Sequence, residues 1–299
     1  MNMCGNSLVW LLTSSLPVWE LAVIGSLVRE LRGRLPYFRF FALKNNQWLD
    51  FSTPELWSSL SWRDKALLFA TKGRIWHVWG TPTPWWPLIG VHAKTIQSTS
   101  GLKASYRGLS QKSFFIPPAF ESKISWALAE EGFKCSGAPA LFIAGVPNEA
   151  TGYWLSILLN QNMPIFKVPF PKQQEWPGKT LSHSSYILPL MGQRGGVLLL
   201  LSDHPSLALL AAQASILGVP VLSPPSAFLD RLLGSEGYVR VQKSSDGPLL
   251  FEEILFSSFS SQGKNTAVKA RNCLLNVWTP QESVDALLKI YSQLDGALK

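Results

Sequence analysis

The chain has 299 residues, about the length of two domains, and 46% of them are hydrophobic, which suffices for well-packed cores. Its 27 Lys+Arg against 19 Asp+Glu give a net charge of +8, and this excess favours anionic partners. The cations form short scattered groups without a basic helix or a nucleic-acid motif, so we expect no nucleic-acid partner. The three cysteines are odd in number and far apart, which argues against disulfides and zinc and favours a cytoplasmic location.

The first part of the chain alternates strand and helix patterns. Strands are predicted at 8–12, 38–43, 74–79 and 94–97, and helices at 19–31 and 54–69. The apolar stretch from Leu8 to Val28 resembles a membrane anchor, but Pro17 and Glu20 interrupt it, so we interpret it as a buried strand followed by a helix. Alternation of this kind predicts an α/β domain with a parallel sheet.

The pattern pauses at 114–120, where Pro117 and Pro118 stop regular structure, and we place the domain boundary there. The predicted domains are therefore 1–118 and 119–299. In the second domain the predicted strands are 140–144, 165–168, 186–189, 197–201, 219–222 and 238–241, and the predicted helices are 150–160, 206–217 and 227–233. Continuous apolar strands such as 197–201 are typical of a sheet that is covered on both faces.

A polar loop, Ser202 to His204, follows this last apolar strand and opens a helix that ends near Gly218. The start of a helix presents free backbone N–H groups and a partial positive charge, which suits a nucleotide diphosphate. We therefore expect a diphosphate at the N–H groups of Ser206 and Leu207.

This segment resembles the donor-binding strand, loop and helix of GT-B glycosyltransferases, above all the retaining family 4. That family has a Glu, seven residues, a second Glu and then Gly-x-Pro-Val. The Gly-x-Pro-Val falls on 218–221 here, so Pro205 and Gln213 stand where the two carboxylates would be. The segments 271–279 and 284–294 resemble the family's closing helices, the last of which crosses back to the first domain.

The resemblance implies two Rossmann-like domains that face each other across a cleft, and a retaining hexosyltransferase acting on a cell-envelope glycan or lipid. It implies a nucleotide-diphosphate sugar as donor, with no cofactor and no metal. The donor-side candidates are Gly145, Thr151, Gly152, Arg194, His204, Pro205, Ser206, Leu207 and Gln213. The candidates on the acceptor side or in the cleft are Ser15, His77, Trp79 and Ser100. No catalytic residue is identified.

Several alternatives remain open at this stage. His77 is either a packed core histidine or a substrate contact, and Arg194 and Lys167 are either surface charges or a diphosphate clamp. The 13 tryptophans either fill cores or, with the basic charge, form a peripheral contact with an anionic membrane. Because both motif carboxylates are missing, a non-catalytic sugar-nucleotide-binding or accessory subunit is the main alternative function. A GT-B epimerase or an inverting transferase is a further one.

Overall fold

We describe a computed structural model of the chain. The described residues are 8–14, 16–43, 54–70, 74–80, 94–100, 102–106, 113–122, 138–147, 149–158, 163–170, 179–180, 186–241 and 248–296. Contacts divide the chain into two compact units. Unit 1 comprises Met1–Ser125 with Trp278–Lys299, and unit 2 comprises Trp126–Val277. The sequence placed the change of domain at 118/119, whereas the contacts divide the chain after Ser125 and assign the last helix to unit 1.

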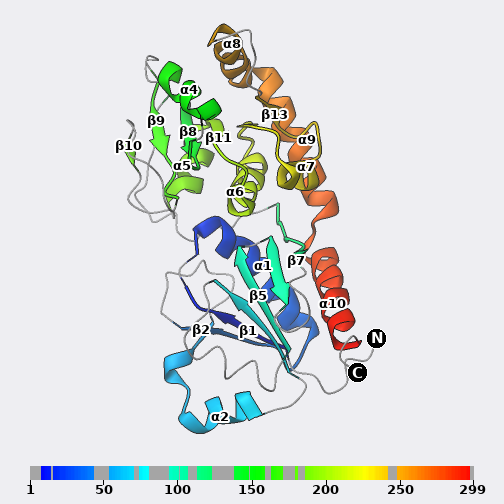
Figure 1. Ribbon diagram of the computed structural model, residues 1–299. Coiled ribbons are helices and arrows are strands. Elements are labelled where there is room, and N and C mark those ends of the chain that lie inside the picture. The colour runs from blue at the N-terminus through cyan, green and yellow to red at the C-terminus, as the bar shows by residue number, and fades with distance from the viewer. Residues whose placement is uncertain are drawn as a thin grey trace. The chain divides into compact units, whose positions relative to one another are not determined.

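Unit 1 has a seven-stranded sheet with the order β3-β2-β1-β4-β5-β6-β7 (Figure 1). The strands are β1 (Leu8–Leu12), β2 (Arg39–Ala42), β3 (Glu55–Leu56), β4 (Ile75–Trp79), β5 (Lys94–Ser100), β6 (Lys103–Tyr106) and β7 (Ser113–Phe115). The first five strands are parallel, and β6 and β7 extend the sheet in antiparallel fashion. Its helices are α1 (Val18–Arg34), α2 (Trp62–Ala70) and α10 (Pro280–Gly296).

Helices cover both faces of this sheet. One face packs β1 and β4 residues such as Val9 and Trp76 against Leu68 of α2. Strand residues alternate between faces, so Trp10 and His77 point the other way, where Tyr291 of α10 meets both of them. The α10 helix also packs on α1. The chain from 8 to 34 is thus a buried strand and a mostly buried helix, as the sequence predicted.

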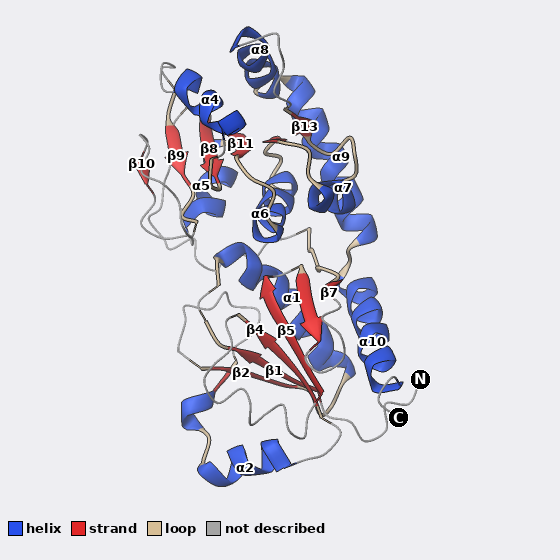
Figure 2. Ribbon diagram, viewed as in Figure 1, coloured by secondary structure: helices blue, strands red, loops and turns tan. Residues whose placement is uncertain are grey.

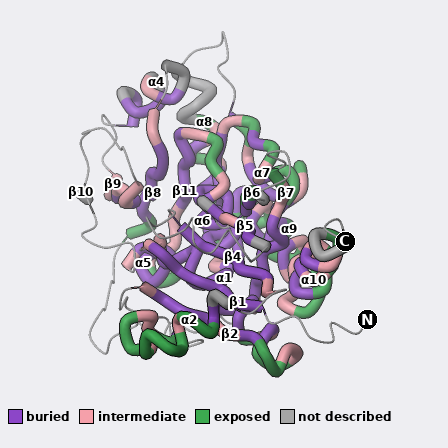
Figure 3. The backbone as a smooth tube through the Cα atoms, turned by 60° about the horizontal axis from the view of Figure 1, so that its bottom comes forward, coloured by how far each residue is buried: buried purple, intermediate pink, exposed green. Residues whose placement is uncertain are grey.

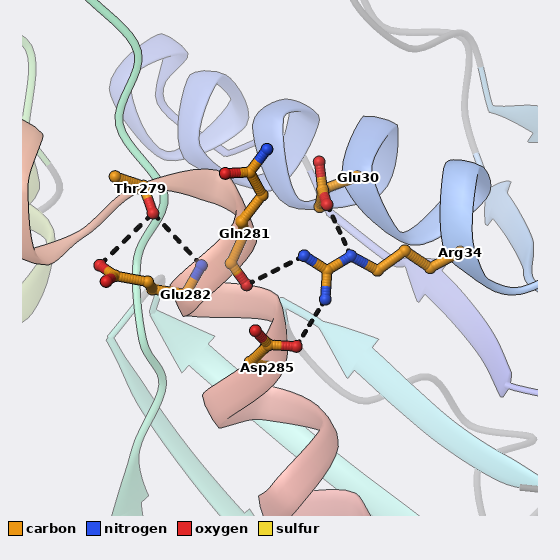
Figure 4. A network of polar contacts seen from close by, with 6 residues as sticks. All are labelled: Glu30, Arg34, Thr279, Gln281, Glu282 and Asp285. Carbon is orange, nitrogen blue, oxygen red and sulfur yellow. Dashed lines mark hydrogen bonds and ion pairs between the residues drawn. The ribbon is translucent and has the colours of Figure 1, made fainter. Parts of the chain in front are cut away.

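A polar network fixes the start of α10 on α1 (Figure 4). The Arg34 guanidinium contacts Asp285 at 2.5 Å and Glu30 at 2.6 Å, and it reaches the backbone carbonyl of Gln281. Thr279 caps the helix, because its hydroxyl accepts a hydrogen bond from the Glu282 backbone N–H at 3.2 Å. Packing of the C-terminal helix on the first unit is therefore confirmed.

Two chain segments that connect the units run side by side within unit 1. The Phe120 backbone N–H donates to the carbonyl of Trp278 at 2.9 Å, and the Ser283 hydroxyl donates to the carbonyl of Pro118. The Phe115 and Trp278 rings pack with centroids 5.5 Å apart. The segment that leaves unit 1, which contains Pro117 and Pro118, is thus hydrogen-bonded to the segment that returns at Trp278.

Unit 2 has a six-stranded parallel sheet with the order β10-β9-β8-β11-β12-β13. The strands are β8 (Ala140–Ala144), β9 (Ile165–Lys167), β10 (Lys179–Thr180), β11 (Gly196–Leu200), β12 (Val221–Ser223) and β13 (Val239–Arg240). The helices are α4 (Glu149–Leu158), α5 (Ile187–Arg194), α6 (Pro205–Ile216), α7 (Ala227–Leu233), α8 (Pro248–Ser258) and α9 (Ser261–Val277). Figure 2 shows helices and strands alternating along this unit.

The unit 2 sheet is also covered on both faces. Leu141 and Val197 pack with Trp154 of α4 and Leu255 of α8 in one hydrophobic cluster. The alternate strand residues face the other helices. The α6 helix contacts α5, α7 and α9 there, and it is buried along nearly its whole length (Figure 3).

Two predicted elements are wrong. The segment 186–189, predicted as a strand, belongs to α5, since Pro189 lies in the first helical turn, where a missing N–H costs nothing. The helix predicted over 54–69 is divided into the two-residue β3, one 3-10 turn (Trp57–Ser59) and α2. Ser61 caps α2 by accepting the Asp64 backbone N–H at 3.1 Å, which starts a new helix. Strands β6 and β10 and helix α8 were not predicted.

Candidate functional site

The candidate site is the carboxyl edge of the unit 2 sheet between β8 and β11. The strand order reverses there, because β9 and β10 lie on one side of β8 and β11 to β13 lie on the other. Ligands of open parallel sheets bind outside the carboxyl ends of the strands at such a reversal. Two loops leave the sheet at this point, Gly145–Pro147 after β8 and Leu201–His204 after β11.

The two loops are in direct contact at Gly145. Its φ of +105° is a backbone conformation that favours glycine, and a Cβ atom there would lie 2.7 Å from Ser202 Oγ and 3.0 Å from Leu207 Cδ1. The backbone N–H of Val146 donates to Ser202 Oγ at 3.3 Å. The predicted donor residues Gly145 and Leu207 therefore meet, and no side chain at 145 separates the loops.

His204 caps the helix that opens at this edge. Its Nδ1 accepts a hydrogen bond from the Ser206 backbone N–H at 3.1 Å, and Pro205 occupies the first helical position. The Ser206 N–H, which we expect to meet a diphosphate, donates to the imidazole in this structure. Histidine is not among the usual capping residues, so no capping motif predicts this contact. The ring also packs edge-on against Phe170, with centroids 5.1 Å apart.

Because Nδ1 of His204 accepts this hydrogen bond, that nitrogen carries no proton. Burial lowers the pKa of His204 below its usual 6.5, and the nearby Asp203 carboxylate opposes that shift. Asp203 in turn accepts a hydrogen bond from the hydroxyl of Ser226.

Ser226 belongs to a second group of polar contacts at this edge that sequence reasoning missed. Its hydroxyl caps α7 by accepting the Leu229 N–H at 3.1 Å, and its own N–H donates to Tyr238 Oη at 3.2 Å. Tyr238 donates to Asp230 at 2.8 Å, which also binds Arg240. A serine directly before a predicted helix is a recognisable capping signal. These contacts fix the loop Leu201–His204 to the residues that directly precede α7.

Gln213 lies two turns along α6 and is 3% exposed. Its Oε1 has no hydrogen-bond partner among the described residues. A buried acceptor without a partner costs free energy, about 1–3 kcal/mol by mutational comparison. Thr151 and Gly152 lie in the first turns of α4, the helix that follows β8, with Thr151 buried. They are thus on the chain segment that leaves the same edge.

Arg194 does not belong to this edge, and its assignment to the diphosphate is corrected. It ends α5 just before β11 begins, and its Nε donates to the carbonyl of Ala138, ahead of β8. Its guanidinium packs 5.3 Å from the Phe166 ring centroid. The strands of five residues that separate this edge from Gly145 span roughly 13–16 Å. Lys167, by contrast, ends β9 at the carboxyl edge.

The unit 1 candidates are placed differently. His77 and Trp79 are fully buried, with no exposed surface for a ligand to contact, so their assignment as ligand contacts is not supported. Ser15 lies outside the described residues, and Ser100 ends β5 with its side chain outside the description. The core interpretation of His77 is the one that the structure favours.

His77 is held by hydrogen bonds at both ring nitrogens. Nδ1 lies 2.6 Å from Tyr291 Oη and Nε2 lies 2.5 Å from Ser98 Oγ, while Trp10 Nε1 donates to the same Tyr291 oxygen at 3.1 Å. Burial lowers the pKa of His77 to about 3 and raises that of Tyr291 well above 10. A neutral His77 satisfies both contacts when Tyr291 donates to Nδ1 and Nε2–H donates to Ser98.

Two further findings bear on the ligand and location. Within the described residues no three or more His, Cys, Asp or Glu side chains come together as a metal site would require. The helices described here also include none with the length and apolar character needed to cross a membrane.

No protein-family model matches the sequence, and no curated protein sequence matches it. Solved structures do match over nearly the whole chain. A glycosyltransferase from Rickettsia africae matches with a TM-score of 0.58 and 10% identity, over 97% of this chain and 99% of that one. Sucrose-phosphate synthase from Thermosynechococcus elongatus matches with a TM-score of 0.56 and 11% identity, over 97% and 100%.

A third match is the Anabaena protein HepE, solved in complex with UDP and glucose. Its TM-score is 0.52 at 11% identity, over 96% of this chain and 99% of that one. At such identities the likeness is one of fold. The two units, a mainly parallel sheet in unit 1 and a parallel sheet in unit 2, each between layers of helices, give the chain the GT-B fold of glycosyltransferases with two Rossmann-like domains.

Proposed function

We propose that the chain is a glycosyltransferase that binds a nucleotide-diphosphate sugar at the carboxyl edge of the unit 2 sheet. The observation that carries the proposal is the meeting of the Gly145 loop with Ser202 and Leu207 at the start of α6. Backbone N–H groups at a helix start suit a diphosphate. The fold supports the same ligand class, since a structural neighbour was solved with UDP and glucose.

The resemblance makes Gln213 the candidate ribose contact, although it lies about two turns, or roughly 12 Å, along α6 from this edge and is 3% exposed. Its buried Oε1 lacks a partner among the described residues, and a ribose hydroxyl is a donor of the kind that it needs. The bond would be a neutral one, which contributes about 0.5–1.5 kcal/mol.

The finer parts of the proposal follow the family that the sequence resembles. We infer a hexose donor, transfer with retention, and a cell-envelope glycan or lipid acceptor bound by unit 1. The charge of the diphosphate would be met by the start of α6 and by a cation, for which Lys167 at the end of β9 is placed on the correct edge. This chemistry requires no metal and no cofactor.

A second candidate function is a non-catalytic sugar-nucleotide-binding or accessory subunit. It is favoured by the two residues on the motif positions, since Pro205 has no polar side chain and Gln213 has no charge. Neither can stabilise the positive charge that develops on a sugar ring during transfer. Binding would then persist without chemistry.

Calorimetric titration with UDP and GDP tests the binding site. Gln213→Ala should weaken binding by about three- to tenfold, the loss of one neutral hydrogen bond. Gln213→Glu should tighten it, since a carboxylate accepts a hydroxyl proton more strongly. Gln262→Ala, an exposed glutamine on α9, is the matched control and should change nothing. Absence of nucleotide binding by the unmodified protein would refute the proposal.

Radiolabelled nucleotide sugars distinguish the two candidate functions. A glycosyltransferase should slowly hydrolyse its donor even without acceptor, and release of labelled sugar above the level seen without protein would support it. Tight binding of the same donor with no release, in the presence of envelope glycans and lipids, would favour the non-catalytic subunit.

We also propose that unit 1 contacts an anionic membrane surface through α2. Trp62 and Leu67 are 74% and 65% exposed on this helix, and Arg63 and Lys65 flank them. Tryptophan favours the membrane interface and each nearby cation adds about 1 kcal/mol on acidic lipid. Trp62→Ala should reduce sedimentation with acidic liposomes, whereas Phe256→Ala, an exposed aromatic of unit 2, should not. Equal sedimentation of both variants would count against this contact.

A further inference from the structure

We propose that His204 exchanges partners when a nucleotide binds, so that binding takes up a proton. In the structure its Nδ1 caps α6 by accepting the Ser206 N–H. In the complex, the protonated ring would donate to a phosphoryl oxygen, and the released Ser206 N–H would donate to another. This inference rests on the nucleotide site proposed above and deepens it.

The geometry motivates the exchange because the same N–H cannot serve both partners. The Ser206 N–H is the donor that a diphosphate at this helix start would use, and Pro205 before it has no N–H to offer. A ligand must therefore displace the imidazole or forgo the contact. His204 lies at the end of the loop, and its ring, though packed on one side by Phe170, keeps exposed surface and can turn toward a ligand.

Displacement alone would leave an anion beside a ring that has lost its bond. Protonation favours the contact with the anion over that of a neutral ring, which has one donor, because imidazolium has two donors and no acceptor. It also places a positive charge against the diphosphate, which raises the affinity of the ring for the proton. The proton comes from solvent, and no bond other than these hydrogen bonds changes.

The charged groups around the ring are compatible with this behaviour. Asp203, the neighbouring carboxylate, favours the protonated ring, and Ser226 holds that carboxylate in place. Phe170, which packs on the ring, is uncharged. The first turn of α6 has no acidic residue, and Asp230 of α7 is paired with Arg240. The free ring has its pKa lowered by burial, so it starts from the neutral form near pH 7.

The test is titration of the full chain with UDP between pH 6 and 8. The dissociation constant of the unmodified protein should fall toward low pH, by at most about tenfold per pH unit. Repeating the titration in buffers of different ionisation enthalpy should reveal uptake of a fraction of a proton. His204→Asn is the matched variant, since asparagine caps a helix well but does not titrate. It should fold normally, bind UDP and show no such uptake.

The outcomes separate the inference from the function on which it rests. Protonation of UDP itself is common to both proteins, so it cancels in their difference. If the unmodified protein and His204→Asn bind UDP with the same pH dependence and the same proton uptake, the partner exchange is refuted while the nucleotide site stands. If neither UDP nor GDP binds the unmodified protein at any pH, the site is refuted and the exchange with it.

Discussion

Each unit has a glycine and a histidine near the point where its strand order reverses, but the histidine is buried in unit 1 and exposed in unit 2. In unit 1, Gly80 follows β4 and closes on Thr13 and Ser14 after β1, while His77 is sealed in the core beneath. In unit 2, Gly145 follows β8 and closes on the loop that carries His204 at the surface. The histidine inside a strand is thus buried and structural, whereas the one in the loop after a strand keeps surface that a ligand can contact.

Replacement of the two glycines should have the largest effect on the free energy of unfolding, and it tests whether the two sheet edges differ in nucleotide binding. Both have positive φ, and an added Cβ would lie 2.2 Å from Ser14 Oγ at Gly80 and 2.7 Å from Ser202 Oγ at Gly145. We expect Gly80→Ala and Gly145→Ala each to lower the free energy of unfolding by about 3 kcal/mol. Only Gly145→Ala should also weaken UDP binding.

Urea denaturation and UDP titration measure the two effects. Gly33→Ala is the control, because this residue is within α1 and its added Cβ would meet nothing within 4 Å. It should be neutral or stabilising by up to about 1 kcal/mol. Equal loss of UDP binding in both of the destabilised variants would mean that the two edges do not differ as proposed.

Removal of the Tyr291 hydroxyl tests whether the buried hydrogen bonds around His77 stabilise unit 1. Tyr291→Phe leaves Trp10 Nε1 and His77 Nδ1 without their shared partner in the core. We expect a loss of about 2 kcal/mol in the free energy of unfolding, measured by urea denaturation, and no change in UDP binding. Ser292→Ala, at a partly exposed position one residue on, should cost less than about 0.5 kcal/mol. A Tyr291→Phe protein as stable as the parent would show that the buried network contributes nothing.

The pH dependence of stability should distinguish His77 from surface histidines. The folded chain keeps His77 neutral down to about pH 3, whereas the unfolded chain takes up the proton near 6.5. The neutral ring therefore makes its full contribution to the free energy of unfolding above pH 6.5. That free energy falls by about 1.4 kcal/mol per pH unit as the pH decreases from 6.5 toward 3.

His77→Gln provides the measurement, since an amide can replace both hydrogen bonds without titrating. Between pH 7.5 and 5 its unfolding free energy should fall by about 2 kcal/mol less than that of the unmodified protein. The same fall in both proteins would mean that the ring is not held neutral in the core.

The smallest effect is expected at the start of α10, where the cap is a side-chain hydroxyl rather than an imidazole. Thr279→Ala removes the acceptor of the Glu282 N–H and should cost about 1 kcal/mol in unfolding free energy at any pH. Thr279→Ser, which keeps the hydroxyl, should restore most of the loss. A serine variant as unstable as the alanine variant would locate the effect in the lost methyl group instead.

The sequence alone determined most of the strand and helix elements. Buried strands such as β1, β8 and β11 are continuous apolar runs, and a sheet covered on both faces requires that pattern. The start of α6 after Ser202–His204 was also predictable, because a polar loop ended an apolar strand and a helical pattern followed. Packing of the last helix on the first unit was expected from the resemblance, and Tyr291 provides its contact with the core.

Only the tertiary structure decided which candidate residues meet. Gly145 and Leu207 lie 62 positions apart in the chain, and parallel pairing of β8 with β11 brings them together. Arg194 lies at the opposite edge because it precedes β11, and the predicted strand 197–201 already implied this, since residues before and after one strand lie at its two ends. The partners of His77 and His204, by contrast, were not determined by the sequence. Hydrogen bonds to Tyr291, 214 positions away, and to Ser206, two positions away, depend on where side chains pack, which the spacing of hydrophobic residues does not specify.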